Sequence, residues 1–351
     1  MKKNLLILSA SYGAGHNTAA QNIEKFYKEK GFNVKIIDLV DFVGFFGKQT
    51  QSFYQDFCTK YPNVWDVTYN ILDKNIIKKI FFSIEYPYYQ KNFDDLINKI
   101  NPNIIISVFP FWGGFIKNNI DNFGKKYKSG IVITDAVSLH NIWYLKGNYI
   151  DKYFFIDDLS KEIFQKKFHH KTNNLITSFF PIEKKYFINK EFIDDNKIYI
   201  LLSGINYKYS NNLLKLLQSE NFELNIIKGR NKEDYTKLKK DYKDIKNFNF
   251  IESIDLKENY KNIGIFIGKA GGATLSECIA TNTPMIIPDF IPGQEEGNIE
   301  LVKKLGLGIY EDNIEKTIFL LKYVNWNKMI GNFNSTKKEN SCEIIFNSLE
   351  N

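Results

Sequence analysis

Short, continuously apolar runs recur along the chain, and most are followed by a turn and then by apolar residues at helical spacing. Such runs predict strands covered on both faces, as in a parallel sheet. Their alternation with helical segments predicts an α/β fold with two Rossmann-like domains. The predicted strands are residues 5–10, 33–37, 103–109, 130–134, 153–156 and 174–177 in the first domain, and 197–202, 223–228, 247–251, 263–267 and 284–287 in the second.

The same pattern sets the expected domain limits. We expect the first domain over residues 1–182, a polar linker over 183–196 and the second domain over 197–323. A final segment, 324–351, has a helical pattern and could cross back to the first domain. The chain has 351 residues, of which 44% are hydrophobic, so each domain has enough apolar side chains for a core.

Residues 41–91 interrupt the alternation with a dense set of aromatic side chains and interleaved lysines. One interpretation is a pair of helices that pack into the core. The other is an amphipathic insertion that places aromatic rings and lysines on an anionic bilayer surface. The candidate acceptor or membrane contacts in this region are Phe45, Phe46, Tyr61, Trp65 and Tyr69.

The turn after the first predicted strand presents a histidine. In Ser11-Tyr-Gly-Ala-Gly-His-Asn-Thr, two glycines precede His16, and a helical pattern follows. The segment is not a G-x-G-x-x-G fingerprint, because Thr18 stands at the third glycine position, and it is not a Walker A loop. Open α/β sheets bind ligands at the carboxyl ends of their strands, so His16 is a candidate functional residue. A histidine that only caps the helix is the alternative.

A second candidate lies at the carboxyl end of the predicted strand 130–134. Asp135 follows this strand directly, where a site residue is expected and a plain turn residue is the alternative. His140 and Trp143 lie close behind it in a loop and are further candidates for acceptor or membrane contact.

The second domain contains the motif Gly268-Lys-Ala-Gly-Gly-Ala-Thr-Leu-Ser-Glu277, which follows the predicted strand 263–267. Thr274 is expected to cap a helix whose free N–H groups could hold a phosphate. Glu277 could then reach a ribose. Thr-x-x-Glu is also the signature of a capping box, which is the structural alternative. A cap does not explain the second polar cluster, Gln294 to Asn298, one strand later.

Composition narrows the choice of partners only slightly. The net charge of +7 favours anionic partners such as nucleic acid, acidic lipid or nucleotide. Cys58, Cys278 and Cys342 are far apart, so we expect free thiols in a reducing compartment and no metal site. No run of 18 apolar residues exists, and the apolar run 5–8 is too short for a signal peptide, which together predict a cytoplasmic protein.

The ordered set of motifs resembles one branch of the GT-B glycosyltransferases. The motifs are Gly13-Ala-Gly-His16, Thr134-Asp135 with His140 and Trp143, Tyr61-Pro-Asn-Val-Trp65 with Tyr69, Lys269-Ala-Gly-Gly-Ala-Thr-Leu-Ser-Glu277 and Pro292-Gly-Gln-Glu-Glu-Gly-Asn298. They are similar to those of the monogalactosyldiacylglycerol synthases and processive diacylglycerol glucosyltransferases, relatives of the peptidoglycan N-acetylglucosaminyl transferase. The resemblance spans essentially the whole chain and implies two Rossmann-like domains facing each other across a cleft.

The resemblance also implies roles for individual residues. His16 would be the general base or lie beside it, and Asp135 would orient it or share the task. Backbone N–H groups around Gly272–Thr274 would hold the diphosphate. The donor-binding residues implied are Gly15, Ser203, Gly204, Lys269, Gly271, Gly272, Ala273, Thr274, Glu277, Gln294, Glu295 and Asn298, with Glu277 on the ribose and Gln294 and Glu295 on the hexose. The chain departs from the family at Ser203-Gly-Ile-Asn206, which has one glycine where relatives have several, and at Ser178-Phe-Phe-Pro181.

The activity implied is an inverting transfer of galactose or glucose from a UDP-sugar to a membrane lipid hydroxyl, with diacylglycerol as the expected acceptor. No cofactor or obligatory metal is expected, and nucleic acid is not an expected partner. The enzyme would lie peripherally on the anionic inner face of the cell membrane. Alternatives are transfer to a sterol, an undecaprenyl-linked sugar or a small metabolite, and a UDP-sugar epimerase-like protein.

Overall fold

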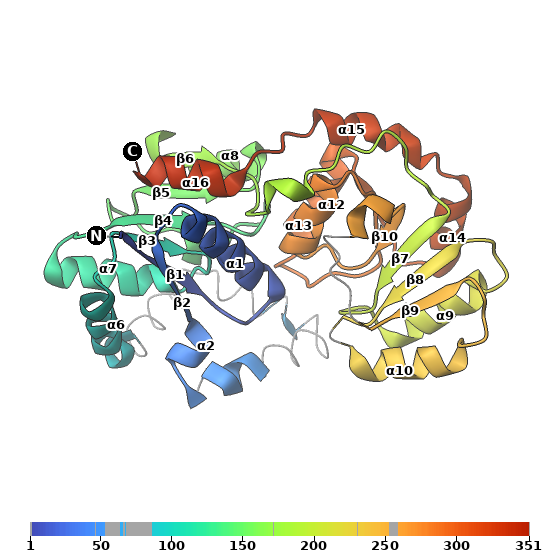
Figure 1. Cartoon of the computed structure of the whole chain (residues 1–351), viewed down its shortest axis with the longest axis horizontal. Helices are drawn as coiled ribbons and strands as arrows, with labels where there is room; N and C mark the ends of the chain where they lie inside the picture. The colour runs from blue at the N-terminus through green and yellow to red at the C-terminus, as the bar shows by residue number, and fades with distance from the viewer. Residues whose placement is uncertain are drawn as a thin grey trace. The chain divides into compact units, whose positions relative to one another are not determined.

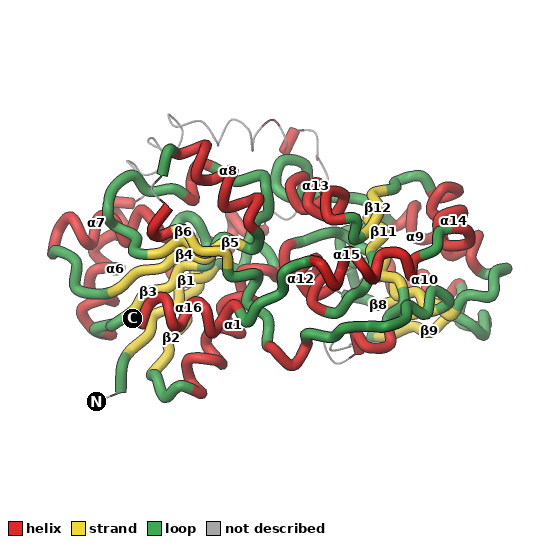
Figure 2. The backbone as a smooth tube through the Cα atoms, turned by 90° about the horizontal axis from the view of Figure 1, so that it is seen from above, coloured by secondary structure: helices red, strands yellow, loops and turns green. Residues whose placement is uncertain are grey.

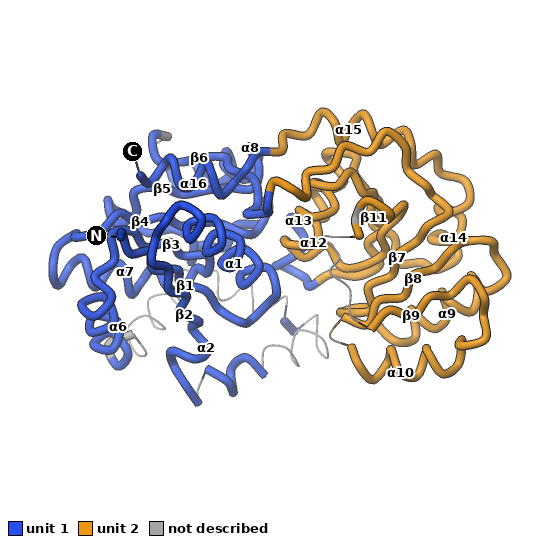
Figure 3. Tube along the Cα trace, in the orientation of Figure 1, with its two compact units in different colours: residues 1–183, 291–297, 339–351 blue, residues 184–290, 298–338 orange. Residues whose placement is uncertain are grey.

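The computed structural model describes residues 2–45, 47–52, 64–65, 67, 86–170, 172–229, 231–252 and 259–350. The chain divides into two compact units (Figure 3). Unit 1 comprises residues 1–183, 291–297 and 339–351, and unit 2 comprises residues 184–290 and 298–338. Each unit contains one sheet of six parallel strands (Figure 1), which confirms the expected α/β fold with two parallel-sheet domains.

The sheet of unit 1 has the strand order β2-β1-β3-β4-β5-β6. Its strands are β1 (Asn4–Ser9), β2 (Asn33–Asp38), β3 (Ile104–Ser107), β4 (Lys128–Val132), β5 (Lys152–Phe155) and β6 (Leu175–Thr177). Its helical elements are α1 (Ala14–Glu29), α2 (Leu39–Phe42), α6 (Tyr86–Ile100), α7 (Trp112–Phe123), η1 (Asn141–Trp143), α8 (Asp158–Phe168), η2 (Thr172–Asn174) and α16 (Ser341–Glu350). The order reverses direction between β1 and β3, which makes their carboxyl ends the switch point of the sheet.

Helices cover both faces of this sheet (Figures 1 and 2). Side chains of α6 and α7, including Phe93, Trp112 and Phe115, pack on one face. On the other face, α1 and α16 pack together, and Leu349 of α16 lies so close to Gly130 of β4 that a Cβ there would be 3.1 Å from its Cδ1. The C-terminal helix is therefore part of the core of unit 1.

Unit 2 has the strand order β12-β11-β10-β7-β8-β9. Its strands are β7 (Lys197–Leu201), β8 (Glu223–Ile227), β9 (Phe248–Ile251), β10 (Ile265–Ile267), β11 (Met285–Ile287) and β12 (Gly308–Tyr310). Its helical elements are η3 (Lys184–Tyr186), α9 (Tyr207–Leu217), α10 (Lys232–Asp241), η4 (Tyr260–Asn262), α12 (Gly272–Ala280), α14 (Ile314–Tyr323), η5 (Trp326–Met329) and α15 (Ile330–Ser335), while α13 (Glu296–Leu305) begins in segment 291–297. Here the switch point lies between β7 and β10.

Three expectations from the sequence differ from the structure. The predicted linker is built into unit 2, since the backbone N–H of Ile188 donates to Ala280 O and Lys190 Nζ donates to Thr283 Oγ1 at 2.7 Å. Strand β12 was not predicted, because it has only three residues and begins with a glycine. The final segment is not one helix. The hydroxyl groups of Ser335 and Thr336 donate to carbonyl oxygens of the preceding turn, and the backbone becomes extended at Thr336 (ψ 125°).

The place of α16 in the core of unit 1 predicts the effect of truncating its buried face. Ile345 is fully buried, so Ile345→Ala is expected to lower the free energy of unfolding by about 2–5 kcal/mol. Asn347→Ala, on the exposed side of the same helix, should change it by less than about 0.5 kcal/mol. Urea denaturation of the full chain measures both. Equal, small effects would contradict the packing described.

Candidate active site

His16 lies in the first turn of α1, at the switch point of unit 1. Gly13 is the N-cap residue, and its backbone is extended, with no side-chain cap. His16 is only 8% exposed, and its imidazole makes a T-shaped contact with the ring of Phe109, with centroids 5.0 Å apart. Gly15 is in the same turn and half-buried. His16 is therefore enclosed by the segments that follow β1 and β3.

The hydrogen bonds of His16 define which nitrogen is available for chemistry. Nδ1 lies 2.8 Å from the carbonyl oxygen of Val108 and 3.1 Å from Thr134 Oγ1. A carbonyl oxygen only accepts, so Nδ1 carries the proton and donates to Val108. Nε2 is then the nitrogen with a lone pair, and it can accept a proton from a substrate.

Asp135 follows β4 and is held by Trp143. The indole Nε1–H donates to Asp135 Oδ2 at 2.8 Å, and the ring of Trp143 lies 6.5 Å from that of His16. Burial lowers the pKa of His16 below its ordinary 6.5, while the charge of Asp135 and the hydrogen bond to Val108 offset part of this change. Burial raises the pKa of Asp135 above its ordinary 3.8, opposed by His16 and by Trp143.

This arrangement, which we call the base site, comprises His16, Val108, Thr134, Asp135 and Trp143. It brings together the two residues expected from the sequence. It also adds Val108, which sequence reasoning missed, and Thr134, which belonged to a quoted motif but had no assigned role. Thr134 could have been found, because it precedes Asp135 at the same strand end, whereas Val108 acts through its backbone and leaves no side-chain signal. A neutral imidazole beside a carboxylate can take up a proton, and the carboxylate stabilises the resulting imidazolium.

The other residues expected to contact the acceptor or the membrane differ in how exposed they are and in the contacts they make. Trp143 is only 1% exposed, which corrects its expected bilayer contact, because its indole is used to hold Asp135. His140 accepts from the N–H of Ile142 and caps η1. Trp65 is buried, whereas Phe45 is 77% exposed. Phe46, Tyr61 and Tyr69 lie outside the described residues, as does most of the segment 41–91.

Helix α12 begins differently from the expectation. Gly271 is its N-cap residue, with no side-chain cap, and the N–H of Leu275 donates to Gly271 O at 2.9 Å. Thr274 therefore lies inside the first turn and does not cap the helix. The capping-box alternative for Glu277 fails for the same reason. The N–H groups of Gly272, Ala273 and Thr274 precede the first helical hydrogen bond and can bind an anion.

Three neighbouring strands of unit 2 bring small residues to the start of α12. Gly204, after β7, has φ +80°, and a Cβ there would lie 2.7 Å from Cδ of Lys269, which follows β10. Gly229, after β8, has φ +55°, and a Cβ there would lie 2.1 Å from Ser203 Oγ. The side chain of Lys269 can therefore pack directly against the backbone of Gly204, because glycine has no Cβ. We call Ser203, Gly204, Gly229, Lys269 and the first turn of α12 the amide site.

Two side chains of the polar cluster 294–298 hold backbone segments in place, each within its own unit. Asn298 is buried and donates through Nδ2 to Ala270 O at 2.7 Å, which fixes the backbone immediately before α12. Glu295, also buried, accepts at Oε2 from the N–H of Ile291 and closes its own loop. Gln294 is half-buried in the same loop, and Glu277 is 9% exposed on α12.

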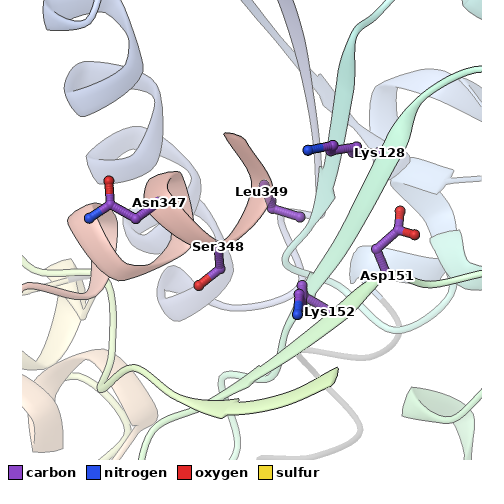
Figure 4. A pocket seen from close by; sticks show the side chains of 6 residues that line it. All are labelled: Lys128, Asp151, Lys152, Asn347, Ser348 and Leu349. Atoms are coloured by element: carbon purple, nitrogen blue, oxygen red, sulfur yellow. The ribbon is translucent and has the colours of Figure 1, made fainter. Parts of the chain in front are cut away.

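A hollow of about 680 Å³ lies elsewhere in unit 1 (Figure 4). Lys128 and Lys152 begin β4 and β5, so the hollow lies at the amino ends of these strands, while Asp135 follows the carboxyl end of β4. The hollow is therefore separate from the base site. Lys128 and Lys152 each donate to a backbone carbonyl, of Glu350 and of Asn173.

Two family models match the chain, one in each unit. Residues 16–178 match the model described as monogalactosyldiacylglycerol (MGDG) synthase, and residues 207–325 match the glycosyltransferase family 28 C-terminal domain. The processive diacylglycerol beta-glucosyltransferase of Bacillus licheniformis is 28% identical, over 99% of this chain and 94% of that protein. The protein of the same name from Bacillus subtilis is 26% identical, with the same two coverages.

Solved structures support the fold. Acinetobacter baumannii MurG aligns with a TM-score of 0.61 at 11% identity, over 99% of each chain. The Staphylococcus aureus (S. aureus) MnaA–UDP structure aligns with a TM-score of 0.62 at 12% identity, over 99% of this chain and 96% of that one.

The two sheets match the GT-B fold of these solved structures, and each unit matches a family model of glycosyltransferases. Within that class, the chain resembles the monogalactosyldiacylglycerol synthases and the processive diacylglycerol glucosyltransferases, as the sequence motifs indicate. No helix in the described parts of the chain is both long and apolar enough to span a bilayer.

The hydrogen bonds and charges at the base site predict how His16 titrates. Its pKa is expected below 6.5 in the folded protein, so the imidazole stays neutral at pH 7. Asp135→Asn removes a negative charge that raises this pKa, so the variant should titrate at still lower pH. Imidazole NMR resolves the four histidines of the chain. A His16 transition above pH 6.5, or an upward shift in Asp135→Asn, would contradict the described environment.

Proposed function

We propose that this protein transfers a hexose, glucose or galactose, from a UDP-sugar to the hydroxyl of diacylglycerol, with inversion at the anomeric carbon. The observation that carries the proposal is His16, oriented by Val108 and with a pKa lowered by burial, in a domain that matches the MGDG synthase model. The names of the relatives specify diacylglycerol and a β-linked product. A β-glycoside formed from an α-linked UDP-sugar requires inversion, which a single displacement accomplishes.

In this mechanism, His16 Nε2 takes the proton of the acceptor hydroxyl as its oxygen forms a bond to the anomeric carbon. The bond from that carbon to the UDP oxygen breaks, and UDP leaves with the bonding electrons. A positioned base of this kind typically contributes about 10²–10⁴-fold to the rate. Asp135, held by Trp143, stabilises the imidazolium that forms next to it.

The amide site is the proposed donor site. The N–H groups of Gly272, Ala273 and Thr274 and the ammonium group of Lys269 would stabilise the charge that develops on the diphosphate. Glu277 would accept hydrogen bonds from ribose hydroxyls. Asn298 keeps the backbone of Ala270 in place, so its role is to support the loop. We propose that Gln294 and Glu295 contact the hexose.

The proposed enzyme acts at the cytoplasmic face of the membrane. Its chemistry needs no metal, because the helix N-terminus and Lys269 neutralise the leaving group.

The competing function is that of a UDP-sugar epimerase-like protein. A putative UDP-N-acetylglucosamine 2-epimerase from Listeria monocytogenes shares the fold, with a TM-score of 0.58 at 11% identity, over 100% of this chain and 96% of that one. That likeness concerns the fold alone, whereas the family model over residues 16–178 favours transfer.

The decisive experiment supplies radiolabelled UDP-glucose or UDP-galactose to the full-length protein with diacylglycerol in anionic vesicles, and with sterol or water-soluble acceptors in parallel. We expect label in a glycosyl-diacylglycerol, with and without EDTA. His16→Ala should lower the transfer rate by about 10²-fold or more while UDP binding persists. His169→Asn, which changes an exposed histidine after α8, outside the base site, is the matched control. Full activity of His16→Ala would overturn the base assignment, and label in none of the lipids would overturn the transfer.

The donor assignment makes a separate prediction for Glu277. Glu277→Gln keeps the shape of the side chain but removes its charge, which weakens hydrogen bonds from ribose hydroxyls. We expect the KM for the UDP-sugar to rise about tenfold or more, since hydrogen bonds to charged groups are worth about 1.5–3 kcal/mol. Steady-state kinetics should show no change for Glu300→Gln, an exposed carboxylate on α13. An unchanged KM in Glu277→Gln would remove Glu277 from the donor site.

A further inference from the structure

The turn that follows Asp135 has a strained backbone at Val137. The φ angle of Val137 is +54°, in the left-handed region that a β-branched residue rarely adopts. The N–H of Ser138 donates to the carbonyl oxygen of Ala136, which closes a three-residue turn around Val137. Both Ala136 and Val137 are buried. A conformation of this kind persists only where surrounding contacts hold it, and such residues are common at functional sites.

Helix α8 holds this turn at two points. The N–H of Val137 donates to Ser160 Oγ at 2.9 Å, and Ser160 is fully buried. The hydroxyl group of Ser160 donates to Asp157 Oδ2 at 2.6 Å, so its proton is already used and its oxygen accepts from the turn. Towards the other end of the helix, Lys167 Nζ donates to the carbonyl oxygen of Leu139 at 2.6 Å. Ser160 therefore binds the strained residue directly.

The buried turn is also the surface on which Gly297 packs. Gly297 lies in the first turn of α13, and a Cβ there would be 2.0 Å from Ala136 O and 2.3 Å from the backbone nitrogen of Ser138. Only a residue without a side chain fits at this distance. The segment 291–297, which ends at Gly297, belongs to unit 1, so this contact lies within one unit. The position of the turn therefore sets the position of the segment.

The segment that ends at Gly297 contains the residues proposed to contact the hexose, Gln294 and Glu295. Glu295 closes this loop, because its Oε2 accepts from the N–H of Ile291 at 2.7 Å and its own N–H donates to Ile291 O at 2.9 Å. A loop closed in this way moves as one piece, so a shift of Gly297 displaces both side chains. The turn on which it packs follows Asp135 directly, so the carboxylate of the base site and the loop share one support.

We propose that Ser160 is a positioning residue for the sugar donor: it fixes the strained turn at Val137, and the turn places the segment 291–297 where its side chains contact the hexose. Ser160 acts through the backbone of the turn and not by contact with the donor. The inference rests on the proposed function for the identity of the ligand. The support itself concerns contacts within unit 1 alone.

The first test does not depend on activity. Hydrogen exchange of the peptide spanning residues 291–300 is measured by mass spectrometry in the full-length protein. We expect Ser160→Ala to speed exchange in this peptide by about threefold or more, the factor expected for the loss of a neutral hydrogen bond, and Gly297→Ala to do the same. Ser210→Ala, at a buried serine of α9, and Gly331→Ala, where a Cβ would meet nothing within 4 Å, are the matched controls. Wild-type exchange in either test variant overturns the proposal.

A double-mutant cycle shows whether Ser160 acts through the strain at Val137. Glycine adopts a φ of +54° without strain, so Val137→Gly removes the need for the support. Ser160→Ala should therefore speed exchange less in the Val137→Gly background than in the wild-type protein. Equal effects in the two backgrounds would mean that Ser160 acts elsewhere, which also overturns the proposal.

The second test compares the dissociation constants of UDP-sugars and of UDP, by calorimetric titration of the full-length protein without acceptor. Ser160→Ala should raise the Kd of the UDP-sugar about three- to tenfold, the loss expected for one neutral hydrogen bond. It should leave the Kd of UDP, which has no hexose, unchanged, and Ser210→Ala should change neither. An equal rise in both constants indicates a general structural loss and overturns the positioning role. If the wild-type protein binds neither UDP-glucose nor UDP-galactose, the proposed function is wrong, and the exchange experiments decide the support alone.

Discussion

The hydrogen bond between His16 Nδ1 and the carbonyl oxygen of Val108 is the contact on which the base site depends. It exists because β1 and β3 are neighbours, and because the N–H of Val108 continues their ladder to Leu8 O. A backbone carbonyl cannot donate, so the bond selects one imidazole tautomer without any ionisable partner. Asp135 affects the pKa of the imidazole and not its orientation, and Trp143 holds the carboxylate of Asp135 in place. The chemistry of unit 1 thus follows from the order of its strands.

The two units apply one architecture to opposite chemical tasks. In each, the strand order reverses beside the first strand of the unit, and the candidate residues follow the strands at the reversal and one strand next to them. Unit 1 places a proton acceptor there and encloses it with aromatic rings. Unit 2 places glycines and backbone N–H groups there, which leaves the main chain open to close approach by an anion.

The sequence alone was sufficient to predict both parallel sheets and two residues of the base site. Continuous apolar runs predict both parallel sheets, since strands buried on two faces need apolar residues at every position. His16 and Asp135 could be identified because His16 lies in the glycine-containing turn after such a run and Asp135 directly follows one. The start of α12 was mispredicted, because Thr274 resembles a cap and an N-cap glycine has no side chain to mark it. Val108 and the contact between Ser160 and Val137 could not be predicted, since one is a backbone group and the other joins residues 23 positions apart.

The glycine at the start of α12 has a consequence for how this protein can evolve. Serine, aspartate or asparagine at an N-cap position commonly stabilises a helix by about a few tenths of a kcal/mol relative to glycine. At position 271, that side chain would occupy the N–H groups that an anion needs. If the proposed donor binds here, selection for helix stability and selection for donor affinity act in opposite directions at this single position. A lineage that lost its substrate would be free to replace Gly271, so the identity of this residue records whether the site is still in use.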